Sequence, residues 1–155
     1  MNHLNVYCIP GLGMNPLLYK YLQLPNCNII PVTWISPLKK ETLPEYALRL
    51  SQQIDTSQPF VLIGVSFGGM CAIEISKKLN PLQTILISSS KVSTELPREL
   101  AGFKYIPIYH ILSDFLYLKF TMLIRKRLGV TPPLKAEFKT MLAQPPKNYF
   151  PVPYT

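Results

Sequence analysis

One stretch near the middle of the chain constrains its fold more than any other. Residues 60–65 are apolar and rich in β-branched side chains, and they run directly into the pattern Gly64-x-Ser66-x-Gly68. The residues that follow, 70–75, return to an apolar helical pattern. The sequence therefore predicts a strand, a tight turn at Ser66 and a helix. Gly64 and Gly68 meet a steric need, because strand and helix approach closely at such a turn only if these positions are small.

This arrangement suits a particular chemistry. A serine on a sharp strand-to-helix turn exposes its hydroxyl at the carboxyl end of a sheet, as in a nucleophile elbow. The competing interpretation is a glycine-rich turn without a catalytic role. The buried type of strand before Ser66, and a helix that ends with Lys77, Lys78 and the stop signal Pro81, favour the functional interpretation.

A second motif agrees with the first. Residues 6–9 predict a short strand, and Pro10-Gly11-Leu12-Gly13 then turns the chain toward a helical pattern over residues 16–22. Acyl-transfer sites need two backbone N–H donors for the oxyanion, one after the nucleophile and one from an early glycine-rich loop. We therefore predict Ser66 as the nucleophile and the N–H groups of Phe67 and Leu12 as the oxyanion donors.

The pattern along the chain predicts an α/β fold. Strands are expected at 5–9, 28–33, 60–64 and 84–88, joined by crossover helices, which gives one parallel sheet in the spatial order second, first, third, fourth. The second crossover is the best marked. Thr42 and Glu45 form a capping box, and the apolar residues from Leu43 to Ile54 then share one helical face.

Taken together, these elements resemble the N-terminal half of an α/β-hydrolase, and residues 63–70 are especially similar to small bacterial members. The resemblance implies a partial α/β-hydrolase fold, with about four parallel strands, crossover helices and a helical cap segment. It divides the chain into a core at 1–90 and a cap-like region at 91–144. The four prolines of residues 145–155, which follow no strand or helix period, predict an irregular tail. The resemblance also implies a serine hydrolase that acts on a small ester, thioester or related acyl substrate, without a cofactor or metal.

In this family the acid and the histidine of the triad follow the serine, from loops after later strands. The sequence reaches Thr155 before such strands appear. His3 precedes the first strand, at the far side of the sheet. His110 with Asp114, and Glu95, are weak candidates because they fall after the last predicted strand or in the cap region. We therefore expect a truncated chain that is weakly active or inactive as given.

The alternative function is a non-catalytic, hydrolase-like module that binds an apolar ligand or a partner. Loss of the later strands would leave one edge of the 84–88 strand unpaired, which predicts self-association through that edge.

Charge and cysteine content limit the expected class of partner and the expected cellular compartment. The formal net charge is +8, concentrated in the last third of the chain around residues 125–127, which favours a solvated face over a nucleic-acid partner because no nucleic-acid motif accompanies it. The three cysteines, Cys8, Cys27 and Cys71, lack metal-ligand spacing, so we expect reduced thiols and a cytoplasmic protein. Neither a secretory signal nor a membrane span is predicted.

Overall fold

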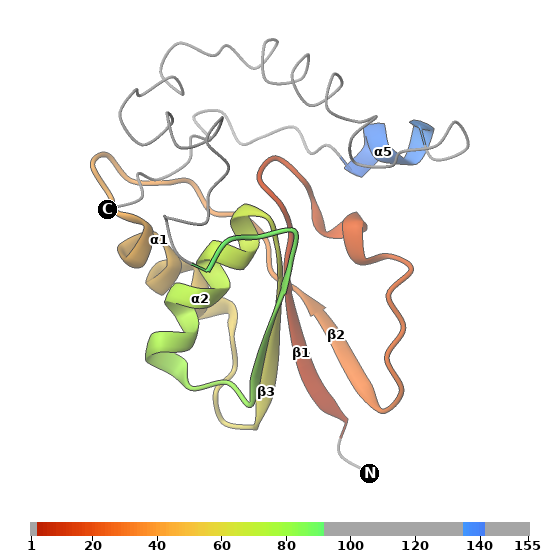
Figure 1. Ribbon diagram of the computed structural model, residues 1–155, viewed down its shortest axis with the longest axis horizontal. Helices are drawn as coiled ribbons and strands as arrows, with labels where there is room; N and C mark the ends of the chain where they lie inside the picture. Colours follow the sequence, from red (N-terminus) through yellow and green to blue (C-terminus); the bar gives the residue numbers. More distant parts are fainter. Residues whose placement is uncertain (1–2, 92–134, 142–155) are drawn as a thin grey trace.

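A computed structural model describes residues 3–91 and 135–141 of the chain (Figure 1). In chain order, the elements are β1 (Leu4–Ile9), the 3₁₀ helix η1 (Pro16–Tyr19), β2 (Cys27–Pro31), α1 (Leu43–Leu50), the 3₁₀ helix η2 (Ser51–Gln53), β3 (Phe60–Val65), α2 (Phe67–Leu79), β4 (Gln83–Ile87) and α5 (Lys135–Met141).

The four strands form one sheet in the order β2-β1-β3-β4, and each neighbouring pair is parallel. The predicted fold class and strand order are therefore confirmed, and each strand begins or ends within two residues of its expected position. Ile9 of β1 pairs with Gly64 of β3, and Val65 of β3 pairs with Ile87 of β4. This register aligns the carboxyl ends of β1, β3 and β4.

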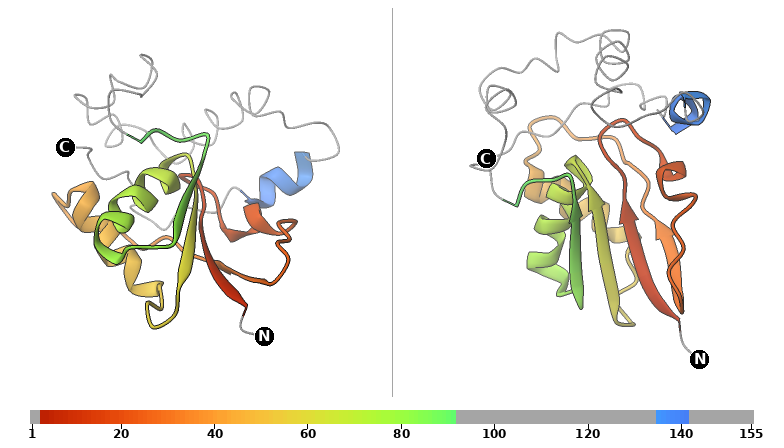
Figure 2. Two further views of the ribbon diagram at one scale, coloured as in Figure 1. Left: turned by 60° about the horizontal axis from the view of Figure 1, so that its bottom comes forward. Right: turned by 45° about the vertical axis from the view of Figure 1, so that its right-hand side comes forward.

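Helices α1 and α2 lie on one face of the sheet and the η1 segment on the other (Figure 2). An apolar layer fills the space on each face. The first layer combines α1 and α2 with alternate strand residues such as Tyr7, Ile9 and Leu62. The second layer combines the η1 region, through Tyr19, with the intervening strand residues such as Val6. This period of two is what a strand buried on both faces requires.

The predicted capping box begins α1. The Glu45 carboxylate accepts hydrogen bonds from the Thr42 backbone N–H at 2.7 Å and from its hydroxyl at 2.8 Å. Both hydrogen bonds stabilise the ionised carboxylate, so they lower the pKa of Glu45. The predicted helical face continues to Ile54, but the α-helix ends at Leu50 and η2 completes the segment.

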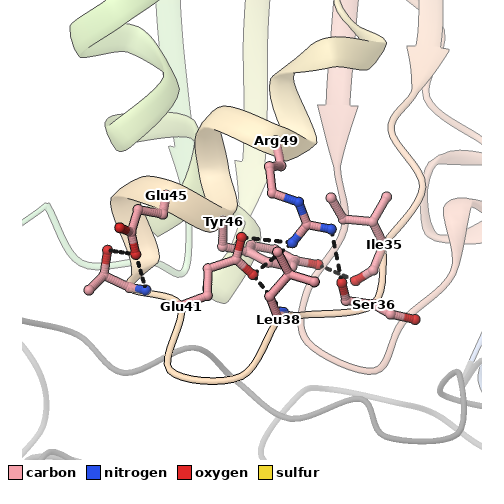
Figure 3. Close-up of polar contacts among 8 residues, drawn as sticks. Ile35, Ser36, Leu38, Glu41, Glu45, Tyr46 and Arg49 are labelled. Atoms are coloured by element: carbon pink, nitrogen blue, oxygen red, sulfur yellow. Dashed lines mark hydrogen bonds and ion pairs between the residues drawn. The ribbon is translucent and has the colours of Figure 1, made fainter.

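An ion pair between the buried Glu41 and the half-buried Arg49 fixes the loop between β2 and α1 (Figure 3). Glu41 is 6% exposed, and its carboxylate accepts from the Arg49 Nη1 at 2.7 and 2.8 Å and from the Leu38 N–H at 2.8 Å. Arg49 also donates to the Ser36 carbonyl at 3.2 Å. Arg49 thus ties the loop to α1 at Ser36 and Glu41, and Leu38 is bonded to Glu41 within the loop.

The helix expected over residues 16–22 is shorter than the sequence suggested. It is the 3₁₀ helix η1, whose N–H to C=O bonds span three residues, from Leu18 to Asn15 and from Lys20 to Leu17. Tyr19 provides the physical reason: its buried hydroxyl donates to the Ile9 carbonyl at 2.6 Å and ties this short segment to β1. This hydrogen bond from Tyr19 to β1 therefore outweighs the local helical pattern.

The helix α5 lies against the η1 region. The Asn15 N–H donates to the Met141 carbonyl at 2.8 Å, and its side-chain amide donates to the Thr140 carbonyl at 2.6 Å. The Tyr21 hydroxyl donates to Glu137 at 2.6 Å. This helix falls within the cap-like region expected at 91–144. The rest of that region and the tail at 145–155 lie outside the described residues.

On the other side of the sheet, β4 is the end strand of the part that the structure describes. Ile85 and Ile87 are 36% and 45% exposed. The register places them on the same face as Ile63 and Val65. Self-association through this edge stays a prediction. No helix within residues 3–91 and 135–141 has the length and apolar character needed to cross a membrane.

We predict that Arg49→Met destabilises the chain by about 2 kcal/mol, because it leaves the buried Glu41 carboxylate without its cationic partner. Urea denaturation measures the change in the free energy of unfolding. Lys20→Met is the control: Lys20 lies 3.8 Å from Glu137 with its side chain 54% exposed. Loss of such an exposed pair costs less than about 0.5 kcal/mol. Equal losses in the two variants would contradict the importance of burial.

We also predict that Cys8 and Cys71 resist DTNB at pH 8 in the folded chain, whereas Cys27 reacts. Cys8 and Cys71 are fully buried, and Cys27 is partly exposed. Burial raises the pKa of Cys8 to about 11 and that of Cys71 further, so neither forms the reactive thiolate. Counting the thiols that react with and without denaturant tests this. The Cys8→Ala variant keeps Cys27 and Cys71. Rapid reaction of both thiols in the folded variant would show that Cys71 is accessible and would contradict the prediction.

Candidate active site

Ser66 occupies the turn between β3 and α2, and its backbone is strained. Its φ of 53° and ψ of −121° lie in a region that residues with a Cβ rarely adopt. Its side chain is exposed. Within the described residues, its hydroxyl forms no hydrogen bond. The strand, turn and helix around Ser66 are therefore those that the sequence predicted.

Hydrogen bonds on both sides hold this backbone. The Ser66 N–H donates to the Ile87 carbonyl at 2.9 Å. The Ser66 carbonyl accepts from the Gly69 N–H at 2.9 Å and from the Ser89 hydroxyl at 2.7 Å. Since both partners beyond the turn belong to β4 and the residues just after it, β4 fixes the orientation of Ser66.

Glycines allow three segments of backbone to meet here. A Cβ on Gly64 would lie 2.5 Å from the Gly68 carbonyl oxygen and 2.5 Å from the Gly69 Cα. A Cβ on Gly68 would overlap the carbonyl groups of Ile9 and Pro10. The absence of side chains at these two positions therefore brings β3, the first turn of α2 and the end of β1 into direct contact.

Phe67 begins α2, and its backbone N–H donates to none of the described residues. This N–H belongs to the first turn of a helix of 13 residues, where the aligned peptide dipoles give a partial positive charge. An oxyanion formed beside the Ser66 hydroxyl would meet a donor that is already oriented.

The loop after β1 passes next to Ser66. A Cβ on Gly11 would lie 3.7 Å from the Ser66 Cβ, in ordinary van der Waals contact. The Gly11 carbonyl accepts from the Met14 N–H at 2.9 Å, and Gly13 adopts a positive φ of 68°, so the loop is a tight turn. Leu12 follows Gly11 directly and is half-buried. The structure thus brings together the segments of all three predicted site residues.

Trp34 is a neighbour of this site that the sequence interpretation did not consider. Its indole N–H lies 3.3 Å from the Gly11 carbonyl and 3.1 Å from the Met14 carbonyl. Its ring packs against Phe67, with ring centroids 5.7 Å apart. A usable signal existed: Trp34 is the only tryptophan of the chain and follows a predicted strand, where the carboxyl ends of a parallel sheet gather loops.

Of the candidate acids and bases, His3 is the one that the structure describes. His3 is exposed and precedes β1, at the edge of the sheet opposite Ser66. His110, Asp114 and Glu95 lie outside the described residues. Within residues 3–91 and 135–141, no group of three or more His, Cys, Asp or Glu side chains is arranged to hold a metal ion.

Comparison with solved structures identifies the fold. ClbQ from the colibactin NRPS/PKS pathway aligns with a TM-score of 0.57 at 19% identity, over 90% of this chain and 62% of that chain. MenH from S. aureus aligns with a TM-score of 0.66 at 16% identity, over 93% and 62%. Est816, an N-acyl homoserine lactone degrading enzyme, aligns with a TM-score of 0.56 at 15% identity, over 90% and 55%.

These likenesses show that the chain has a partial α/β-hydrolase fold, with four parallel strands and their helices. The chain spans 62% of the length of ClbQ and of MenH. No family model matches the sequence, and neither does any curated protein.

We predict that Gly64→Ala destabilises the chain by about 3 kcal/mol, because the new methyl group would press on backbone atoms that cannot move aside. Gly11→Ala is the matched control from the neighbouring loop. Its nearest new contact would be the Met14 Sδ at 3.5 Å, which is ordinary packing, so we expect a change within about 0.5 kcal/mol. Thermal unfolding of both variants tests this, and similar melting temperatures for the two would contradict it.

Proposed function

We propose that this chain is a serine acyl hydrolase of the α/β-hydrolase type, acting on an ester, thioester or related small acyl substrate. The observation that carries the proposal is the strained backbone of the exposed Ser66, with a φ of 53°, at the N-terminus of α2. A strained conformation persists where the surroundings enforce it, and such residues cluster at functional sites. The shared fold with ClbQ, MenH and Est816 supports the same proposal.

In this proposal each residue has one role. The Ser66 Oγ attacks the acyl carbonyl carbon, and the alcohol or thiol of the substrate leaves with a proton. The N–H groups of Phe67 and Leu12 stabilise the oxyanion as the C–O bond forms. Water then attacks the acyl-serine, which releases the carboxylic acid and restores the hydroxyl.

The nucleophile needs a base to accept its proton. His110 is the histidine that follows Ser66 in the sequence, and the sequence-based expectation that it is not this base stays a prediction. His110→Ala tests it directly: a rate equal to that of the unmodified chain agrees with the expectation, and a loss equal to that of Ser66→Ala makes His110 the base.

We predict that a fluorophosphonate probe labels Ser66, and that Ser66→Ala abolishes the labelling. Hydrolysis of a p-nitrophenyl acyl ester by this variant should fall to at most the residual rate of about 10³- to 10⁴-fold over water that binding and an oxyanion hole alone supply. Mass spectrometry of the labelled peptide and initial rates measure the two effects.

Ser57→Ala is the control, because Ser57 is also exposed but lies before β3, at the opposite end of that strand from Ser66. It should be labelled and should hydrolyse the ester as the unmodified chain does. Equal labelling of the Ser66→Ala variant, or equal ester turnover where the unmodified chain exceeds that residual rate, would refute the proposed function. Ligand binding without labelling or turnover would instead favour a non-catalytic binding module.

A further inference from the structure

Trp34 connects the two segments that carry the proposed oxyanion donors. It lies beyond the carboxyl end of β2, and its indole N–H is shared between the carbonyl oxygens of Gly11 and Met14, at 3.3 and 3.1 Å. The same ring packs against the Phe67 ring, with centroids 5.7 Å apart and planes inclined by 36°. A single side chain thus contacts the loop after β1 and the first residue of α2.

The contact between the Trp34 indole and the Gly11 carbonyl also bears on the direction of the Leu12 N–H. The Gly11 C=O and the Leu12 N–H belong to one peptide unit, which is planar and, like the other peptide bonds that the structure describes, not cis. In such a unit the C=O and N–H point in opposite directions. Whatever fixes the direction of the Gly11 carbonyl therefore fixes the direction of the Leu12 N–H.

Two donors fix that carbonyl, the Trp34 indole and the Met14 N–H at 2.9 Å. Trp34 is itself held, because its ring packs on the buried Tyr46, whose hydroxyl donates to the Ile35 carbonyl at 2.8 Å. The Glu41–Arg49 ion pair holds the loop that follows (Figure 3). The indole is therefore a donor with a fixed position rather than a mobile surface side chain.

We propose that Trp34 is a positioning residue that orients the Gly11–Leu12 peptide, and hence one of the two oxyanion donors. This inference rests on the proposed function for its catalytic meaning. The positioning itself is a property of the loop and can be measured without turnover. Plain packing in the core is the competing explanation, and it predicts a loss of stability without any specific change in the loop.

The first test is amide hydrogen exchange in the Trp34→Phe variant, which keeps an aromatic ring but removes the N–H. The Met14 amide, which donates to the Gly11 carbonyl, should exchange about five- to tenfold faster, as expected for the loss of a hydrogen bond that restrains the loop. Tyr7→Phe is the control. It removes a hydroxyl that accepts from the Asp55 N–H at 2.9 Å, away from the site. Exchange at Met14 should not change in this control.

The second test separates kcat from KM with the p-nitrophenyl ester. Misorientation of one oxyanion donor should lower kcat of Trp34→Phe about tenfold while KM changes less than twofold, because the donor acts mainly in the transition state. Tyr7→Phe should keep both constants. Unchanged exchange at Met14 or equal acceleration in the two variants would overturn the proposal for Trp34. Where turnover depends on Ser66, an unchanged kcat of Trp34→Phe would also overturn it.

Failure of the proposed function gives a different result. In that case Ser66→Ala would hydrolyse the ester as well as the unmodified chain, whatever exchange shows at Met14. The exchange experiment then decides whether Trp34 orients the loop, and Ser66→Ala decides whether the loop serves ester hydrolysis.

Discussion

The rest of the structure depends on the close approach of three backbones at Ser66. The positive φ of this residue costs about 1–3 kcal/mol, which must be offset by its surroundings. Hydrogen bonds offset this cost. The Ser66 N–H donates to the Ile87 carbonyl, and the Ser66 carbonyl accepts from the Gly69 N–H and the Ser89 hydroxyl. They form only if α2 begins directly against β3, and a Cβ on Gly64 would prevent this. The register between β3 and β4, the start of α2 and the conformation of Ser66 are therefore fixed together.

Parallel pairing explains why every strand contributes to this one place. The carboxyl ends of parallel strands lie at the same edge of a sheet, so the loops that follow them become neighbours. Gly11 follows β1, Trp34 follows β2, Ser66 follows β3 and Ser89 follows β4. Gly11 lies beside Ser66, the Ser89 hydroxyl donates to the Ser66 carbonyl, and the Trp34 ring packs against the neighbouring Phe67. The order and direction of the strands thus bring the segments of the site together, and individual side chains add to this arrangement.

The parts of this arrangement that could be predicted from sequence are those with a local signal. Glycine spacing marked the turn at Ser66, alternation and crossover length marked the sheet, and Thr42 with Glu45 marked the start of α1. The contacts of Trp34 with Gly11, Met14 and Phe67 could not be predicted, because they join residues 20 or more positions apart and follow no sequence period. The length of η1 was misjudged for a similar reason: the Tyr19 hydroxyl binds the Ile9 carbonyl, and this tertiary bond decides between competing local patterns.

The loop after β1 is held at two points, and the two do not have equal influence on the proposed donor. Asn15 joins the loop to α5 through the Met141 and Thr140 carbonyls, at 2.8 and 2.6 Å. Between Asn15 and the Gly11–Leu12 peptide stands Gly13, whose positive φ marks a position with wide conformational freedom. A rotation there can absorb a shift of α5 before it reaches the peptide. Trp34 contacts the Gly11 carbonyl directly, so the direction of the Leu12 N–H follows the indole rather than α5.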